Sequence, residues 1–143
     1  MSDGIALPDG YRFEADPAAW DRDAMHAFLE TTYWSAGVGR ERRERGFDNS
    51  RGIAVFSGSR QIGFARVVTD YARFAYVADV YVEPDHTRRG IARAMVEWLH
   101  NCPDLAGITR WLLVTRDAAP VYSGLGYATP DDAHLFMQRR VTR

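Results

Sequence analysis

The sequence predicts a single α/β domain built on a central mixed, mostly antiparallel β-sheet flanked by helices. Residues 53–82 contain three consecutive apolar stretches of strand length separated by tight turns, which is the pattern of antiparallel hairpins. A strand, an amphipathic helix and another strand then follow, and two strands joined by a helical crossover run parallel. The 143 residues contain no repeat and no Pro/Ser-rich linker, so one domain is expected over 1–143.

Six segments are predicted to be strands, because their apolar residues alternate or cluster over strand length. The segment at 109–115, TRWLLVT, is almost wholly apolar, which is typical of a strand buried on both faces. A tight turn at Gly58 and Ser59 separates two of the other strands, and Pro84 follows the end of a third. The predicted strands are 11–16, 53–57, 61–69, 74–82, 109–115 and 135–140.

Four segments are predicted to be helices. Asp21 is the expected N-cap of the first. The second, RERRERG at 40–46, is expected to be a short solvated helix with internal salt pairs that Gly46 ends, with a role toward an anionic substrate as the alternative. The third has an apolar face, with Ile91 and Met95 one turn apart. The predicted helices are 21–32, 40–46, 89–101 and 118–123.

The charge balance argues against a polyanionic partner. The formal net charge is −1, and all 18 cationic residues are arginine. No overall field therefore attracts the chain to nucleic acid or to an anionic membrane, and neither is expected as a partner. Arginine still supplies fixed guanidinium groups wherever a phosphate or carboxylate has to be bound locally.

Other features of the composition point to the cytoplasm. Cys102 has no second cysteine to pair with, which is typical of a reducing compartment. No apolar run approaches the roughly 20 residues that cross a bilayer, and the first ten residues, MSDGIALPDG, do not resemble an export signal. The four histidines have no metal-ligand spacing, so no metal is expected.

The stretch HTRRGIARAMVEWLH, residues 86–100, begins a helix with a glycine that follows two arginines. A helix start leaves four backbone N–H groups unpaired and carries about half a positive charge. A glycine there lets a ligand approach the main chain, and Arg88, Arg89 and Arg93 add fixed positive charge. An anion-binding helix start is therefore predicted, with simple helix capping as the alternative.

The hexapeptide at 87–92, TRRGIA, is similar to motif A of the GCN5-related N-acetyltransferases (GNAT), although Thr87 stands where glutamine or arginine is usual. The preceding strand ends in the apolar-x-Val-x-Pro pattern of that family, at 80–84. The stretch APVYSGLGY at 119–127 resembles the family's second signature through Tyr122, Gly126 and Tyr127. The resemblance extends over residues 50–127 and implies a GNAT-type acyl-CoA N-acyltransferase fold.

The resemblance also implies that acetyl-CoA binds as co-substrate along the strand end and motif A. In this family a bulge in the strand frees an amide for the thioester carbonyl, which here belongs near Val80 or Tyr81, and the pantetheine arm pairs through Val82. The backbone of motif A would hold the diphosphate. The implied cofactor-binding residues are Val80, Tyr81, Val82, Thr87, Arg88, Arg89, Gly90, Ile91, Ala92 and Arg93.

Two catalytic assignments follow from the resemblance and from general chemistry. Tyr122 is the expected general acid toward the coenzyme A sulfur. Asp79 lies in an apolar strand, where an unpaired carboxylate would be costly, and is the candidate base, with a structural hydrogen-bond acceptor as the alternative and Glu83 or water as substitutes. The family often has an asparagine several residues before the tyrosine, and residues 113–120 contain none.

The acceptor is expected to be a primary amine of a small molecule or a peptide. In this family the segment between the first two helices helps to form the acceptor pocket, and here it contains Tyr33 and Trp34, for which packing on the core is the alternative. The sequence predicts an N-acetyltransferase that works by direct transfer. A GNAT-fold module that binds acyl-CoA without catalysis is the alternative, and a homodimer is compatible with either.

Overall fold

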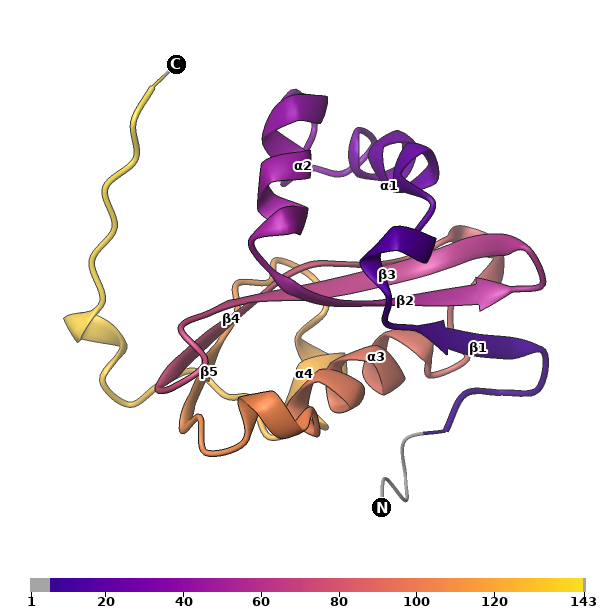
Figure 1. Cartoon of the computed structure of the whole chain (residues 1–143). Coiled ribbons are helices and arrows are strands. Elements are labelled where there is room, and N and C mark those ends of the chain that lie inside the picture. Colours follow the sequence, from indigo (N-terminus) through magenta and orange to yellow (C-terminus); the bar gives the residue numbers. More distant parts are fainter. Residues whose placement is uncertain (1–5, 143) are drawn as a thin grey trace.

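A mixed, mostly antiparallel sheet flanked by helices forms the centre of the molecule, as predicted (Figure 1). The computed structural model describes residues 6–142. Strands β1 to β4 pair antiparallel in chain order, and β5 pairs parallel with β4. The strands are β1 Tyr11–Glu14, β2 Arg51–Ser57, β3 Arg60–Thr69, β4 Phe74–Val82 and β5 Arg110–Leu112, and the α-helices are α1 Arg22–Leu29, α2 Arg40–Asp48, α3 Ile91–His100 and α4 Ala119–Ser123.

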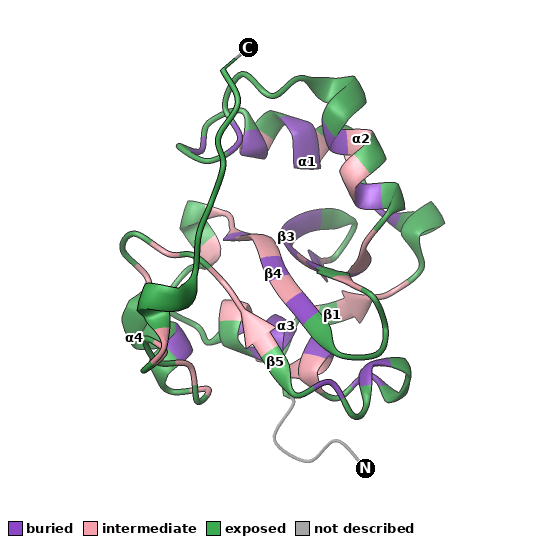
Figure 2. Cartoon of the chain, turned by 90° about the vertical axis from the view of Figure 1, so that its left-hand side faces the viewer, coloured by how far each residue is buried: buried purple, intermediate pink, exposed green. Residues whose placement is uncertain are grey.

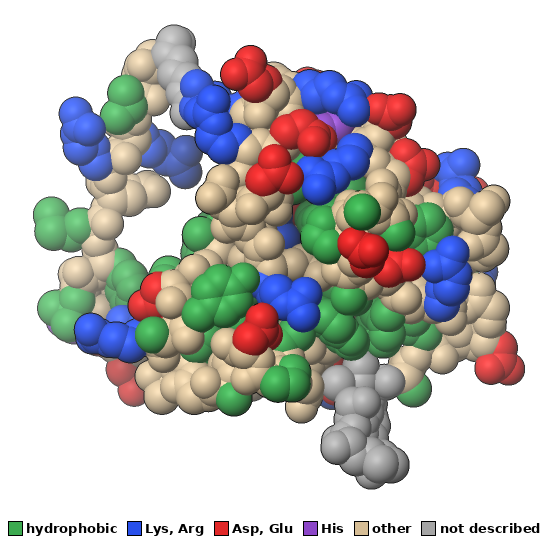
Figure 3. All heavy atoms as spheres, viewed as in Figure 1, with side chains coloured by type: hydrophobic (Ala, Val, Ile, Leu, Met, Phe, Trp, Pro, Cys, Tyr) green, Lys and Arg blue, Asp and Glu red, His purple; other side chains and the backbone are tan. Residues whose placement is uncertain are grey.

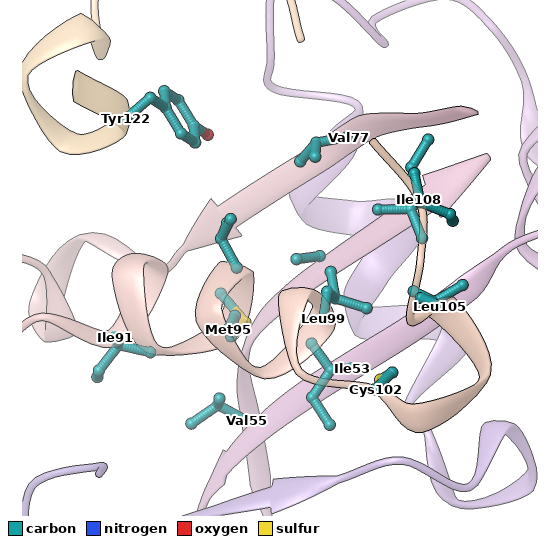
Figure 4. Packing of buried hydrophobic residues seen from close by; sticks show 14 of the residues in the cluster. Ile53, Val55, Val77, Ile91, Met95, Leu99, Cys102, Leu105, Ile108 and Tyr122 are labelled. Atoms are coloured by element: carbon teal, nitrogen blue, oxygen red, sulfur yellow. The ribbon is translucent and has the colours of Figure 1, made fainter. Parts of the chain in front are cut away.

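Each face of the sheet is covered by its own hydrophobic core. Helix α3 packs on one face, where Met95 and Leu99 are fully buried against Ile53 (Figure 4). Helices α1 and α2 lie across the other face, so that the sheet is the middle layer (Figure 2). There Met25 and Phe64 are fully buried in a second cluster. Each such side chain contributes about 1.5–3 kcal/mol relative to an exposed one, which fixes the helices on the sheet.

Helix α2 corrects the sequence prediction in two respects. It does not end at Gly46 but continues to Asp48, and a Cβ on Gly46 would lie 3.6 Å from the Arg66 guanidinium. Gly46 therefore lies within the last turn of the helix, beside the Arg66 side chain, and does not end the helix. The helix is also not wholly solvated, because Arg43 is buried, where it donates to the Ser35 hydroxyl at 2.8 Å and pairs with Glu30.

The last two predicted strands differ most from the structure. The 109–115 segment is a strand only at Arg110–Leu112, lies at the edge of the sheet, and is not buried on both faces: Val114 is 77% exposed. No strand forms at 135–140. A 3-10 turn at Ala133–Leu135 is followed instead by an extended segment without a sheet partner among the described residues. Both departures have one physical cause. A further strand beside β5 would bury the apolar residues of both segments, and none of the described residues forms one.

Within residues 6–142, the structure contains no helix with the length and apolar character needed to cross a membrane.

Candidate active site

A cavity of about 310 Å³ lies between the end of β4, the start of α3 and the helix α4. It brings together every predicted cofactor-binding residue except Arg89, and it includes Tyr122 but not Asp79. Three further lining residues, His86, Ala118 and Val121, were not predicted. The predicted residues at the cavity are Val80, Tyr81, Val82, Thr87, Arg88, Gly90, Ile91, Ala92, Arg93 and Tyr122.

The cavity exists because β4 and β5 separate. The two strands pair only from Phe74, opposite Arg110, to Tyr76, opposite Leu112. In the described part of the chain, no strand pairs with this edge of β4 from residue 77 to 82. The main chain beside Val80 and Val82 is therefore open on the side of the cavity, where an extended group could pair with it as another strand would.

A β-bulge interrupts β4 beside this opening. Tyr81 pairs with Phe64 and Ala78 with Arg66, so two residues of β4, 79 and 80, lie opposite Ala65 alone. Asp79 takes a positive φ of 53°, a conformation that is uncommon for residues other than glycine but that Asn, Asp and His tolerate best. The bulge, at residues 79 and 80, lies beside Val80 and Tyr81, where the resemblance implied it.

The ring of Tyr81 faces away from the cavity. It is 4% exposed, and it stacks on Phe28 in the second core with the ring centroids 4.2 Å apart. Burial raises the pKa of this phenol well above its ordinary value of 10.0, and its hydroxyl has no hydrogen-bond partner among residues 6–142. Tyr81 therefore reaches the cavity through its main chain, which is the part that the sequence assigned to the site.

The start of α3 is built to expose its amides. Gly90 is the N-cap residue with a φ of 77°, and no side chain caps this helix end. A Cβ at Gly90 would meet nothing within 4 Å, so the backbone angle and not space requires glycine. Arg88 also has a positive φ, 63°, and no ion-pair partner among residues 6–142. Uncapped amides beside a guanidinium without an ion-pair partner are the features that an anion-binding helix start requires.

Arg89 does not line the cavity. It instead connects the loop before α3 to strand β1. Its guanidinium donates to the Tyr11 hydroxyl at 2.8 Å, and that hydroxyl lies 2.7 Å from Nδ1 of His86. His86 lines the cavity, so Arg89 is connected to the cavity wall through the Tyr11 hydroxyl alone. The Thr87 hydroxyl is also used internally, because it donates to the Pro84 carbonyl at 3.0 Å.

Tyr122 is mostly buried and lies across the cavity from β4. The side chain is 9% exposed and extends from α4 toward the strand that carries Val77 (Figure 4). Burial, and to a smaller extent Tyr33, raises the pKa of the Tyr122 phenol above its ordinary value of 10.0. The hydroxyl therefore stays protonated through the physiological range and is available as a donor.

Asp79 lies beside the bulge but outside the cavity lining. One carboxylate oxygen accepts from the Arg66 guanidinium at 2.6 Å, and the other accepts from the Trp34 indole at 2.8 Å. The side chains of Asp79 and Arg66 are 10% and 17% exposed. Arg66 also donates to the Ser50 hydroxyl at 2.7 Å. The carboxylate is thus part of a network that joins β3, β4 and the loop before α2.

Glu83, the other candidate base, is paired as well. Arg60 contacts its carboxylate at 2.8 Å, and the Glu83 side chain is 15% exposed. The main-chain amide of Glu83 donates to Ile62 at 2.8 Å, which continues the pairing of β3 and β4 by one residue. In this arrangement the side chain belongs to a strand-to-strand ion pair.

Tyr33 and Trp34, the predicted acceptor-side aromatics, lie next to one another with the ring centroids 5.1 Å apart. They are half exposed, at 49% and 42%. The Arg116 guanidinium lies 3.7 Å from the centroid of Tyr33, so the loop after β5 meets the loop between α1 and α2. These two loops and the bulge therefore approach the same region from different parts of the sequence.

His86 and Val121 could have been found from the sequence by position alone. His86 immediately precedes the TRRGIA motif, and Val121 is adjacent to Tyr122. The pairing of His86 with Tyr11, 75 residues away, has no local signal in the sequence. No group of three or more His, Cys, Asp or Glu side chains able to hold a metal ion occurs within residues 6–142.

The comparisons with known proteins agree with this geometry. The family model of the acetyltransferase (GNAT) domain matches residues 48–129. The chain is 34% identical to a candidate acetyltransferase of the GNAT family from Xanthomonas campestris pv. campestris, whose crystal structure matches with a TM-score of 0.89 over 95% of this chain and 96% of that one.

More distant relatives show the same fold or a similar sequence. A candidate acetyltransferase of Gibberella zeae is 29% identical over an alignment 130 residues long, which covers 75% of this chain and 72% of that protein. A protein of unknown function from meticillin-resistant Staphylococcus aureus, also a candidate acetyltransferase, is 16% identical and shares the fold with a TM-score of 0.74, covering 92% of this chain and 99% of its own. Because the family model matches more than half of the chain, this protein belongs to the GNAT acetyltransferase family.

Proposed function

We propose that this protein is an N-acetyltransferase that moves the acetyl group of acetyl-CoA directly to a primary amine of a small molecule. One observation carries the proposal: a single cavity joins the bulged strand β4, the uncapped start of α3 and the buried hydroxyl-bearing residue Tyr122. Those three parts are what the reaction requires, namely a donor for a developing oxyanion, a site for a diphosphate and an acid for a leaving thiolate.

The residues around the cavity fit coenzyme A. The open edge of β4 beside Val80 and Val82 can pair with the amides of an extended pantetheine arm. The uncapped amides that follow Gly90, together with Arg88, can bind a diphosphate. Acetyl-CoA supplies the activated acetyl group as a thioester. Neither contact depends on Thr87, whose hydroxyl is bonded to Pro84.

Different groups of the chain then have different roles in the reaction. An amide at the bulge, at Val80 or Tyr81, donates to the carbonyl oxygen as negative charge develops on it. The amine nitrogen forms the new bond to carbon as the carbon–sulfur bond breaks. Tyr122 gives its proton to the departing sulfur, and the proton lost by the amine passes to a base or to solvent. No covalent link to the enzyme is required, and Cys102 is buried away from the cavity.

Asp79 is better suited to positioning than to acting as the base. Each of its oxygens already accepts a hydrogen bond, one of them from the charged Arg66. Accepting the amine's proton would cost that ion pair in a mostly buried setting. The carboxylate instead holds the bulge and fixes Trp34 beside it. Its assignment as the general base stays a prediction, with a direct test given in the Discussion.

The acceptor is proposed to enter between the α1–α2 loop and the bulge. Trp34 offers a 42% exposed aromatic side chain there, which favours a cationic or apolar amine body, whereas the Arg116 guanidinium already lies over the ring of Tyr33.

Two measurements test the proposal together. Calorimetric titration with acetyl-CoA should show saturable binding, and a thiol-release assay over a panel of amines should show turnover with at least one of them. Binding without release for any amine would favour the alternative of a non-catalytic acyl-CoA-binding module. Absence of binding at millimolar acetyl-CoA would contradict both.

A further inference from the structure

Arg116 lies in the loop between β5 and α4, and its guanidinium stacks on Tyr33. The guanidinium carbon is 3.7 Å from the centroid of the ring, so the planar group covers one face of the tyrosine. The side chain is exposed, and among residues 6–142 it forms neither an ion pair nor a side-chain hydrogen bond. Its N–H donors, which lie in the plane of the group, are therefore unused.

The arginines of α1 and α2 differ from Arg116, because most of them have a carboxylate partner. Acidic and basic side chains are interspersed over these two helices (Figure 3). Arg22 pairs with Glu44 at 3.0 Å, and Arg40 pairs with Asp23 at 2.6 Å. Such pairs neutralise the charge of that face, whereas the charge of Arg116 remains available to a ligand.

The carboxylates of the surrounding loops and strands do not neutralise Arg116. Asp79 is paired with Arg66 at 2.6 Å, and Glu30, which follows α1, is paired with an arginine of α2. Asp117 is adjacent in the chain, yet it forms no ion pair with Arg116. A fixed positive charge with free donors therefore stands beside the aromatic pair.

A series of contacts connects Arg116 to the bulge in β4. Trp34 donates to Asp79 at 2.8 Å, its ring meets that of Tyr33 at an interplanar angle of 83°, and Tyr33 carries the guanidinium. Tyr33 is also close enough to Tyr122 to contribute to the raised pKa of that phenol. The guanidinium is thus held near the proposed reaction centre, on the side where the acceptor is proposed to enter.

We propose that Arg116 binds a carboxylate of the acceptor, so that the acceptor is a small amino carboxylic acid. The inference rests on the proposed function, because it needs an acceptor amine at the bulge. The carboxylate would accept two N–H bonds from the edge of the guanidinium while Tyr33 holds its face. The carbon chain between the two charged ends would lie along Trp34, and the amine would reach the bulge.

A carboxylate of the acceptor fits Arg116 better than the other anions of this reaction. A phosphate monoester carries about two negative charges near pH 7, and within residues 6–142 no second cation lies over Tyr33 or Trp34. The phosphates of coenzyme A are also less suitable, because Arg116 does not line the cavity, whereas Arg88 and Arg93 do. One guanidinium balances one carboxylate.

Steady-state kinetics with matched acceptors tests the proposal. The ω-amino carboxylates from glycine to aminohexanoate are each compared with the amine in which a methyl group replaces the carboxylate, and with the corresponding aminoalkyl phosphate. The wild type should prefer one of the carboxylates over its matched amine at least tenfold in kcat/KM. Arg116→Gln should raise the KM for that carboxylate about 10-fold to 100-fold and leave the KM for acetyl-CoA unchanged.

Arg12→Gln is the matched control for this replacement. Arg12 also lies over an aromatic ring, that of Phe56 at 4.6 Å, but it belongs to β1 at the opposite edge of the sheet. This variant should keep the preference for the carboxylate. A wild type that prefers the uncharged or phosphate-bearing member of every set, or an Arg116→Gln variant that keeps the preference for the carboxylate, would overturn the inference.

Binding measured without turnover separates this inference from the proposed function. Isotopically labelled protein is titrated with the same ω-amino carboxylates, with and without coenzyme A, while the indole N–H resonance of Trp34 is followed. A saturable shift that Arg116→Gln abolishes would support the carboxylate site even if no amine is acetylated, a result that would contradict the proposed function alone. Turnover of simple amines without such a shift at millimolar carboxylate would refute the site and leave the proposed function intact.

Discussion

The indole of Trp34 donates a hydrogen bond to the carboxylate of Asp79 at 2.8 Å, across 45 residues of sequence. This bond ties the loop between α1 and α2 to the bulge in β4. Asp79 is in turn paired with Arg66, so the acceptor-side aromatics, the bulge and strand β3 form one connected unit. A substitution of Trp34, Asp79 or Arg66 is therefore expected to shift the bulge amides.

Replacing Asp79 by Asn separates positioning from proton transfer. The loss of the ion pair with Arg66 should destabilise the fold by about 3 kcal/mol, because a mostly buried guanidinium is left unpaired. If Asp79 positions the bulge, the rate should fall by a similar factor across pH 6–9. A loss that is concentrated at low pH, where the amine is most protonated, would identify Asp79 as the base. Urea unfolding and a pH–rate profile measure the two effects.

Replacing Tyr122 by Phe tests the proposed acid. Removal of the hydroxyl should lower kcat by about 10²-fold to 10³-fold, while the affinity for coenzyme A changes little. Because burial raises the pKa of Tyr122 above its ordinary value of 10.0, any loss of wild-type rate from ionisation of this phenol should come at a higher pH than for an exposed tyrosine. The neighbouring replacement Tyr127→Phe is the control, since Tyr127 bonds to His100 and not to the cavity. If the Tyr122→Phe variant kept the wild-type kcat, Tyr122 would not be the general acid.

Replacing Arg88 by Gly should raise the stability of the fold and weaken the binding of coenzyme A. Arg88 has a φ of 63°, so Arg88→Gly relieves backbone strain and should stabilise the fold by about 1 kcal/mol. The same change removes a guanidinium from the start of α3 and should weaken the binding of coenzyme A several-fold. Arg88→Ala loses the charge but keeps the strain, and it isolates the second effect. Thermal unfolding and calorimetry on both variants check the pair, and equal affinity for coenzyme A in all three proteins would contradict it.

His100 should make stability depend on pH. Burial lowers its pKa below the ordinary 6.5, although Glu97 partly opposes this. Below about pH 6.5 the unfolded chain takes up a proton that the folded protein resists, so stability falls as the pH drops toward the folded pKa. Above pH 6.5 the group is neutral in both states and adds no slope. Denaturant unfolding between pH 5 and 8 should show a shallower decline for His100→Gln than for the wild type, with the exposed His134→Gln as a composition control.

The order of the elements and the position of the anion-binding helix start could be predicted because their signals are local. Alternating apolar residues define β1 to β4, and the glycine before Ile91 marks the start of α3 within two residues. The bulge was predicted only through the family resemblance. Its physical signature is the register between β3 and β4, which depends on residues 65 and 79–80 meeting across the sheet.

The parts that failed depend on contacts between distant residues. Gly46 looked like a helix end, but the side chain that packs over it, Arg66, lies 20 residues away. Arg43 looked solvated within an RERRER run, but Ser35 and Glu30 satisfy its guanidinium from another loop. The strand pattern at 135–140 was local and strong, yet a strand needs a neighbour, and the described chain offers it none. Local pattern identifies a candidate element, whereas pairing decides whether it forms.

The central claim is that coenzyme A lies with its diphosphate on the amides at the start of α3. Titrating isotopically labelled protein with coenzyme A while following backbone amide resonances tests it most directly. The account predicts the largest shifts at residues 88–93, with a second group at 80–82 along the open edge of β4. Shifts confined to any other surface, or no shift at millimolar coenzyme A, would contradict it.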